Sequence, residues 1–185
     1  MNVADSIETR SGTRLEGLVS NGPSPDLADK LRLFGQFVGD WEAEFTAYAP
    51  DGSRQMEKAE WHFGWVLEGR AIQDVWIIPR RSDRETSNFT RRDYGTTLRF
   101  YDPSLDAWQA VWVSPPHGEV ITFIARKVGD EIVLEGKDPE DAPMRWIFSL
   151  ITSDSFHWRR VFSSDGGQTW KLQKEMSVRR INPVD

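Results

Sequence analysis

The sequence predicts an all-β fold, a single closed antiparallel meander barrel of about ten strands with one N-terminal capping helix. Three observations lead to this prediction. Short runs that alternate apolar and polar residues recur after Gly39, and turn residues separate them about every 8–12 positions, as in sandwiches and barrels. Nine Trp residues supply bulky side chains for one shared interior. A meander of this many strands removes its exposed edges by closing.

Composition limits the class of protein. The chain has 185 residues, the size of one domain, and its 38% hydrophobic and 28% charged residues exclude a disordered or membrane protein. It has no Cys and therefore no disulfide or thiolate site. The net charge of −6 argues against a nucleic-acid partner. No apolar run is long enough to span a membrane, and the N-terminus lacks a secretory segment, so we expect a cytoplasmic protein.

The first 38 residues contain an arm and a helix. Residues 1–22 are polar, which predicts a flexible N-terminal arm ahead of a barrel domain at 23–185. Ser24 suits an N-cap, and Pro25 suits the first helical position. A capping helix at about 25–37 follows, because apolar residues recur at helical spacing: Leu27, Leu31, Phe34 and Val38.

The barrel is predicted to occupy residues 39–181. Residues 41–48 and 58–68 alternate on either side of an Asp51-Gly52 turn, and residues 71–78 form a third strand that Pro79 ends. The remaining strands are expected at 96–101, 107–113, 120–127, 131–136, 144–150, 156–162 and 170–179. The loop at 80–93 holds five Arg residues. One interpretation is a solvated mixed-charge loop. The alternative is a functional loop, either a flap over the barrel mouth or a dimer contact.

The opening of the first strand carries a motif. Phe37-Val38-Gly39-Asp40-Trp41 resembles the G-x-W signature of lipocalins and the wider calycin superfamily. That resemblance implies a Trp at the barrel base with an Arg of the last strand across it, a place that suits Arg179 and Arg180. From residue 31 onward the chain also resembles a bacterial calycin-like family of unknown function with a fatty-acid-binding-protein-like barrel. The shared motifs are Val38–Glu42, Trp65–Arg70, Tyr101–Pro103 and Asp165–Trp170. The resemblance implies a fold and no specific reaction.

A second motif has a structural interpretation. Residues 163–170, with Ser163, Asp165, Gly167 and Thr169 at alternate positions, match the Asp-box of sialidase propellers. In that box the Asp and Thr brace a hairpin through local hydrogen bonds. Because the motif occurs once in a chain too short for a propeller, it predicts a tight hairpin between the last two strands and no glycosidase activity.

Three polar residues share the inward parity of aromatic strands: Asp74, Arg160 and Lys174. They form a buried Asp–Arg or Asp–Lys pair, or a cationic end reaches the rim, or they make a polar patch that orients a ligand's carboxylate or carbonyl.

The register of residues 97–101 is open. Leu98 and Phe100 point inward in one register. In the other, Arg99 and Tyr101 form a clamp for an acidic or phenolic ligand.

The predicted function is binding of a small hydrophobic or aromatic molecule inside the barrel. The expected wall consists of Trp61, Trp65, Trp76, Trp112 and Trp158, with polar groups from Asp74, Arg99, Tyr101, Arg160 and Lys174.

Two alternatives remain open. One is a cofactor-independent isomerase, cyclase or lyase, with Asp74 or Tyr101 as acid or base and Arg99 or Arg160 stabilising an oxyanion. The other is a solid-core structural or dimerisation module, and a homodimer is left open in either case. No cofactor or metal is expected, because the His residues are dispersed rather than set at ligand spacing: His62, His117 and His157.

Overall fold

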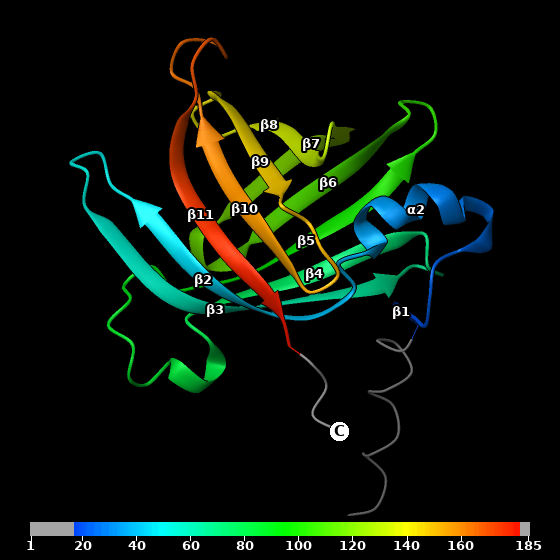
Figure 1. Ribbon diagram of the computed structural model, residues 1–185, viewed down its shortest axis with the longest axis horizontal. Coiled ribbons are helices and arrows are strands. Elements are labelled where there is room, and N and C mark those ends of the chain that lie inside the picture. Colours follow the sequence, from blue (N-terminus) through cyan, green and yellow to red (C-terminus); the bar gives the residue numbers. More distant parts are fainter. Residues whose placement is uncertain (1–16, 182–185) are drawn as a thin grey trace, which may run out of the picture.

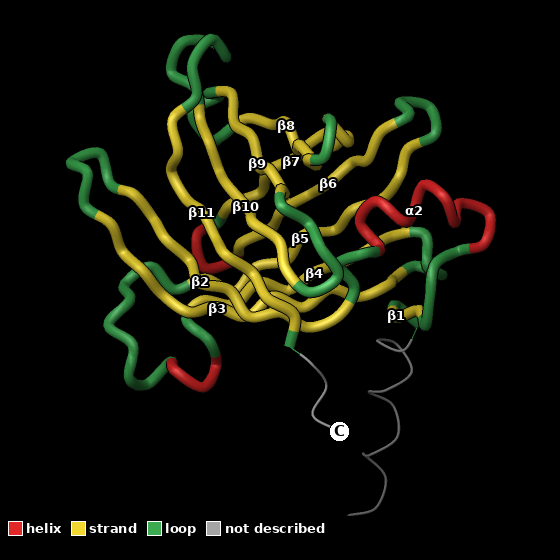
Figure 2. Tube along the Cα trace, viewed as in Figure 1, coloured by secondary structure: helices red, strands yellow, loops and turns green. Residues whose placement is uncertain are grey.

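The computed structural model describes residues 17–181, which contain a closed β-barrel (Figures 1 and 2). The predicted all-β barrel with a short helix near the N-terminus is therefore confirmed. Its ten strands are β2 Gly39–Tyr48, β3 Arg54–Val66, β4 Ala71–Ile78, β5 Asp93–Asp102, β6 Ala107–Ser114, β7 Glu119–Val128, β8 Glu131–Lys137, β9 Pro143–Ser149, β10 Ser155–Phe162 and β11 Lys171–Arg180.

The strands form an antiparallel meander. Each strand from β2 to β10 pairs with the next strand in the chain, and β11 pairs with β2 to close the barrel. We call the end that carries the β3–β4 and β5–β6 turns the closed end. The end that carries the β2–β3 and β10–β11 turns is the open end (Figure 1).

One face of every barrel strand supplies the core. Alternate positions of β2 and β3 are buried from Trp41 to Phe45 and from Ala59 to Phe63, while the residues between them are more exposed. Most of the indoles lie inside, as the alternation predicts. The buried ones are Trp41, Trp61, Trp76, Trp108, Trp112, Trp146 and Trp158.

The helix is shorter than predicted and begins differently. Pro25–Leu27 form a 3-10 turn (η1), and the α-helix α2 spans Ala28–Gly35. Ser24 makes no side-chain capping bond; its backbone N–H donates instead to the carbonyl oxygen of Gly69 at 3.0 Å. The helix ends early because the backbone N–H of Phe37 turns back to the carbonyl oxygen of Phe34 at 3.0 Å.

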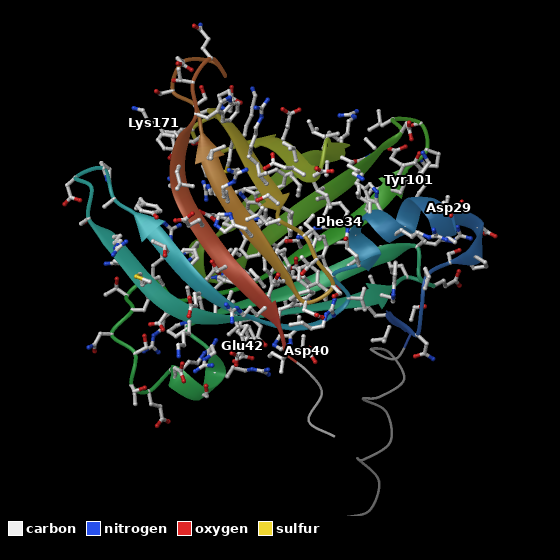
Figure 3. The ribbon with its side chains drawn as sticks, in the orientation of Figure 1. Asp29, Phe34, Asp40, Glu42, Tyr101 and Lys171 are labelled. Carbon is white, nitrogen blue, oxygen red and sulfur yellow. The ribbon has the colours of Figure 1, made fainter. Side chains whose placement is uncertain are left out.

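The helix seals the closed end. Leu31 and Phe34 are fully buried, and Phe34 points from α2 toward the strands in Figure 3. The ring of Phe34 packs edge-on against Trp108 and Phe148 at centroid distances of 4.9 and 6.0 Å. Since aromatic rings supply large apolar areas, these contacts hold the helix in the barrel mouth that it covers.

The G-x-W segment has the geometry that the calycin resemblance implies. The guanidinium of Arg180 lies 4.0 Å from the ring centroid of Trp41. It also donates to the carbonyl oxygens of Val38 and Gln36 at 2.8 and 2.9 Å. Gly39 has φ +128°, and a Cβ there would lie 2.5 Å from Nη1 of Arg180. Glycine is required at this position because both the backbone and the guanidinium exclude a side chain.

The predicted Asp-box hairpin is present between β10 and β11. One carboxylate oxygen of Asp165 accepts bonds from the Ser163 hydroxyl and the Thr169 backbone N–H at 2.6 and 2.9 Å. The other accepts the Thr169 hydroxyl at 2.6 Å. These hydrogen bonds hold the pKa of Asp165 well below its usual range. The motif therefore braces a turn.

Most of the predicted N-terminal arm, residues 1–16, lies outside the described residues. Val19–Ser20 form a two-residue strand, β1, that pairs with Val66 and Trp65 of β3. Within residues 17–181, neither the 3-10 turns nor α2 have the length and apolar character needed to cross a membrane.

Candidate functional site

A cavity lies inside the open end. Five indoles surround it and contact one another in sequence: Trp112 to Trp146, Trp146 to Trp158, Trp158 to Trp61 and Trp61 to Trp76, at centroid distances of 5.3 to 6.3 Å. We call this set the indole arc. The remaining lining residues are Phe45, Asp93, Thr97, Glu119, Arg160, Lys174 and Met176.

The cavity is narrow. The centres of water molecules can occupy about 50 Å³ of it, which is room for about three to five waters. A second space of about 160 Å³ by the same measure adjoins it beside Phe89. The two spaces share four lining residues: Phe45, Trp76, Asp93 and Lys174.

Several donors in the cavity wall have no acceptor among the described residues. They include the indole N–H groups of Trp61, Trp146 and Trp158, the hydroxyl of Thr97 and Nε of Arg160. Leaving a buried donor unpaired costs about 1–3 kcal/mol. Each of these groups would be stabilised by an acceptor that reached it, whether from water or from a ligand.

Arg160 and Lys174 bring positive charge to the cavity from β10 and β11. Arg160 is 9% exposed, and burial lowers its pKa. Lys174 is half-buried; burial and the neighbouring Arg160 charge lower its pKa to about 8. The prediction that both residues face the interior agrees with this placement, whereas their role in binding stays a prediction.

Asp74 and Arg99 form a buried pair instead of lining the cavity. Nη1 of Arg99 donates to Asp74 at 2.5 Å, and both side chains are completely buried. The other Asp74 oxygen accepts the Thr97 backbone N–H at 2.8 Å. The guanidinium lies 5.4 and 5.5 Å from the ring centroids of Phe34 and Phe63. Of the two alternatives for Asp74, this is the structural ion pair.

The structure settles the register of β5. Thr97 and Arg99 are buried, while Leu98 and Phe100 are half-buried on the outer face. The clamp of Arg99 with Tyr101 is not assembled, because the Tyr101 hydroxyl bonds to Asp106 at 2.5 Å beside the helix (Figure 3). The acid–base and oxyanion roles considered for Asp74, Tyr101 and Arg99 thus have no common site in the cavity.

Trp65 also lies away from the cavity. The regular alternation of β3 ends at Gly64. The indole of Trp65 instead packs under the helix, where a Cβ on Gly35 would lie 2.8 Å from it. Its position at the closed end separates it from the indole arc.

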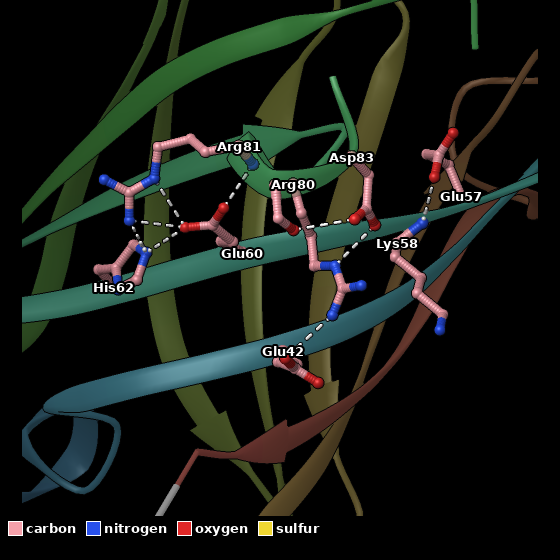
Figure 4. A network of polar contacts seen from close by, with 9 residues as sticks. Glu42, Glu57, Lys58, Glu60, His62, Arg80, Arg81 and Asp83 are labelled. Atoms are coloured by element: carbon pink, nitrogen blue, oxygen red, sulfur yellow. Dashed lines mark hydrogen bonds and ion pairs between the residues drawn. The ribbon is translucent and has the colours of Figure 1, made fainter. Parts of the chain in front are cut away.

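The 79–92 loop divides its contacts between the outer wall and the open end. Arg80 pairs with Glu42 at 3.0 Å, and Arg81 pairs with Glu60 at 2.7 Å on the outside of the barrel (Figure 4). Burial raises the pKa of Glu60, but the hydrogen bonds from Arg81 outweigh this effect and lower the pKa to about 2. Farther along, Phe89 packs on Phe45 at 6.1 Å between ring centroids. This part of the loop covers the second space.

Two of the histidines lie on the outer face, as predicted. His62 lies between Asp40 and Glu60, at 2.6 and 3.1 Å from their carboxylates, and His157 contacts Glu175 at 3.2 Å. In the described residues, His, Asp and Glu side chains form no group of three that suits a metal ion.

Several cavity residues are absent from the sequence-based set. Trp146 and Met176 have the inward parity of their strands and were therefore open to prediction from alternation alone. Asp93 and Glu119 were not, because they are the first residues of β5 and β7, where the alternation only begins.

Comparisons with known proteins support the fold alone. No protein-family model and no curated protein matches the sequence. A solved S-type phycobiliprotein lyase from Guillardia theta is similar in structure, with a TM-score of 0.54, 11% identity, and coverage of 83% of this chain and 93% of that one. Rv2717c from M. tuberculosis has a TM-score of 0.56, 14% identity, and coverage of 86% and 99%. At these identities the likeness shows a shared barrel fold, consistent with the calycin-like resemblance.

Proposed function

We propose that the protein binds a small aromatic molecule in the cavity at the open end of the barrel. The observation that carries this proposal is the indole arc around a cavity, with three buried N–H groups that lack acceptors in residues 17–181. Aromatic side chains favour stacked or edge-on contact with a ring, and the free donors favour a ligand with acceptor atoms at its edge.

The donor pattern favours binding over a solid core. A barrel selected only for packing would fill this space with apolar side chains, because each unpaired donor costs stability. Instead, the indoles of Trp61, Trp146 and Trp158 line one cavity, and their buried N–H groups have no acceptor among the described residues. The barrel shared with the phycobiliprotein lyase supports the proposal at the level of fold.

Entry requires movement of the rim. The cavity alone admits a few waters, but Phe45, Trp76 and Lys174 separate it from the second space. The half-buried Phe89 of the 79–92 loop lines the second space. A ring-sized ligand would displace these side chains and occupy both spaces together.

Tryptophan fluorescence tests the proposal, because the five indoles of the arc surround the site. Titration with aromatic acids, flavonoids, polyketide-like aromatics and fatty acids should give saturable quenching by at least one aromatic compound. Trp158→Phe should weaken its binding about fivefold, the value of one neutral hydrogen bond. Trp108→Phe is the matched control, since Trp108 is equally buried but lies beside Phe34 at the closed end.

Two results of these titrations would contradict the proposed function. If no compound changes either the fluorescence or the thermal unfolding midpoint, the cavity is closed to ligands and the solid-core module becomes the better account. Equal weakening by Trp158→Phe and Trp108→Phe would place the binding outside the indole arc.

A further inference from the structure

Two basic side chains face each other in the cavity without an acidic partner. Arg160 of β10 and Lys174 of β11 are directly opposite in the strand register. Arg160 is nine-tenths buried, and its Nε has no acceptor in the part of the chain that the structure describes. Among residues 17–181, no carboxylate oxygen lies within 4.0 Å of either side chain. Two like charges so placed repel each other, and an anion between them would relieve that repulsion.

The acids nearest to this pair are engaged elsewhere. Glu119 of β7 pairs with Arg91 of the 79–92 loop at 3.3 Å. Asp93 of β5 accepts the Ser114 hydroxyl at 2.7 Å and lies 3.9 Å from Nε2 of His117. Each therefore already has a partner, and the two facing cations remain available to a ligand.

The loop between β8 and β9 adds only a remote influence. Asp138 and Glu140 act on Arg160 through space. The carboxylate of Asp138 accepts the backbone N–H groups of Glu140 and Ala142 at 3.0 and 2.8 Å, which ties it to its own loop.

We infer that the ligand is an aromatic monocarboxylate, with its carboxylate between Arg160 and Lys174 and its ring against the indole arc. This inference rests on the proposed function and names the class of ligand. A guanidinium and an ammonium together supply directed donors and charge for one carboxylate. A dianion such as phosphate is disfavoured, because the nearby carboxylates of Asp93 and Glu119 repel the second charge.

The protonation of Lys174 makes binding depend on pH. Burial, Arg160 and Arg91 lower its pKa to about 8, while Glu119 and Asp93 act in the opposite direction. A bound carboxylate stabilises the ammonium form and raises that pKa. Binding above pH 8 therefore takes up a proton, and the affinity for the acid should fall as the pH rises through 8 to 10.

Matched acids and amides test the inference on the unaltered protein. We would titrate benzoate against benzamide, and indole-3-carboxylate against indole-3-carboxamide, by calorimetry and tryptophan fluorescence at pH 7. Each acid should bind more than tenfold tighter than its amide, since only the acid brings a negative charge to the pair. Inorganic phosphate at the same concentrations should not compete.

Substitutions then locate the effect. Arg160→Gln and Lys174→Met should each weaken acid binding at least tenfold and change amide binding by less than about twofold. Arg159→Gln and Lys171→Met are the controls, because they lie on the same two strands. Arg159 pairs outside with Glu131 at 2.6 Å, and Lys171 is exposed near the hairpin (Figure 3). Both controls should bind the acid normally.

The outcomes separate the two proposals. Equal affinity for acid and amide, or equal losses for both in Arg160→Gln, would overturn the carboxylate assignment and leave aromatic binding intact. If only amides and neutral rings bind, the inference is also wrong. If no compound of either series binds but another aromatic compound quenches the fluorescence, the carboxylate assignment fails and the proposed function stands. If no compound binds at all, both fail.

Discussion

Buried charges at the two ends of the barrel differ in whether they have an oppositely charged partner. At the closed end, Asp74 and Arg99 are fully buried and joined at 2.5 Å, and rings of Phe34 and Phe63 lie beside the guanidinium. At the open end, Arg160 is almost as deeply buried but has no acidic partner in the described chain. The charge of Arg99 is thus paired, although its Nε and Nη2 have no acceptor within residues 17–181, whereas the charge of Arg160 has no opposite charge beside it.

The difference separates a structural role from a binding role. A buried charge beside an opposite charge is compensated, whereas an unpaired one destabilises the folded state until a ligand supplies its partner. Burial alone therefore does not identify the functional end. The partners of each buried group do, and they point to the indole arc.

The largest expected effect is at the closed end. Asp74→Asn removes the charge that Arg99 requires and should lower the free energy of unfolding by about 3–5 kcal/mol. Urea denaturation measures this change. Asp130→Asn, in the exposed β7–β8 turn, is the control and should stay within about 0.5 kcal/mol. A loss below about 1 kcal/mol for Asp74→Asn would show that Arg99 does not depend on the pair.

At the open end, removing a charge should have the opposite sign. Lys174→Met should raise the free energy of unfolding at pH 7 by about 2 kcal/mol, because it removes the cost of holding a half-buried ammonium near Arg160. Lys171→Met should be neutral. Denaturation without ligand measures both variants.

The pH dependence sharpens this second test. The folded pKa of Lys174 is about 8, against 10.5 for the ordinary side chain. Between these values the unfolded chain holds a proton that the folded chain has lost, so the stability of the unaltered protein rises with pH. The advantage of Lys174→Met should therefore shrink from pH 8 to pH 10. An advantage of equal size at pH 7 and pH 10 would contradict the assigned cause.

The smallest expected effect concerns a hydroxyl of the cavity wall. Thr97→Val replaces an unpaired buried hydroxyl with a methyl of the same shape, so stability should change by less than about 0.5 kcal/mol. Ser114→Ala, which breaks the bond to Asp93, should cost about 1 kcal/mol. If Thr97→Val costs as much as Ser114→Ala, the Thr97 hydroxyl has a partner such as an ordered water.

The alternation of side chains made the barrel and much of its lining predictable from sequence. The period-two pattern placed Trp61, Trp76, Trp112 and Trp158 on one face, and the structure finds them around one cavity. The same pattern was weaker at β5, where Thr97 and Arg99 replace the expected apolar residues. There the buried partner Asp74, on the neighbouring strand, determines which face turns inward.

Features that depend on position along the barrel axis were harder to predict. Alternation gives the face of a side chain but not its depth, so Trp65 and Tyr101 were grouped with residues from the other end. The predicted helix end, at about residue 37, lies beyond the observed end at Gly35. The reason is that the turn that brings Phe37 into the core depends on contacts with Phe148 and Phe156. These rings come from strands more than a hundred residues away.

The β2–β11 seam has a consequence for the order of assembly. Among the ten barrel strands, every other pairing joins neighbours in the chain, so those hairpins can form as synthesis proceeds. The seam must wait for the last strand, and until then β2 and β10 each present an unpaired edge. A ribosome stalled before residue 171, or a protease cut ahead of β11, would leave a nine-stranded intermediate prone to self-association.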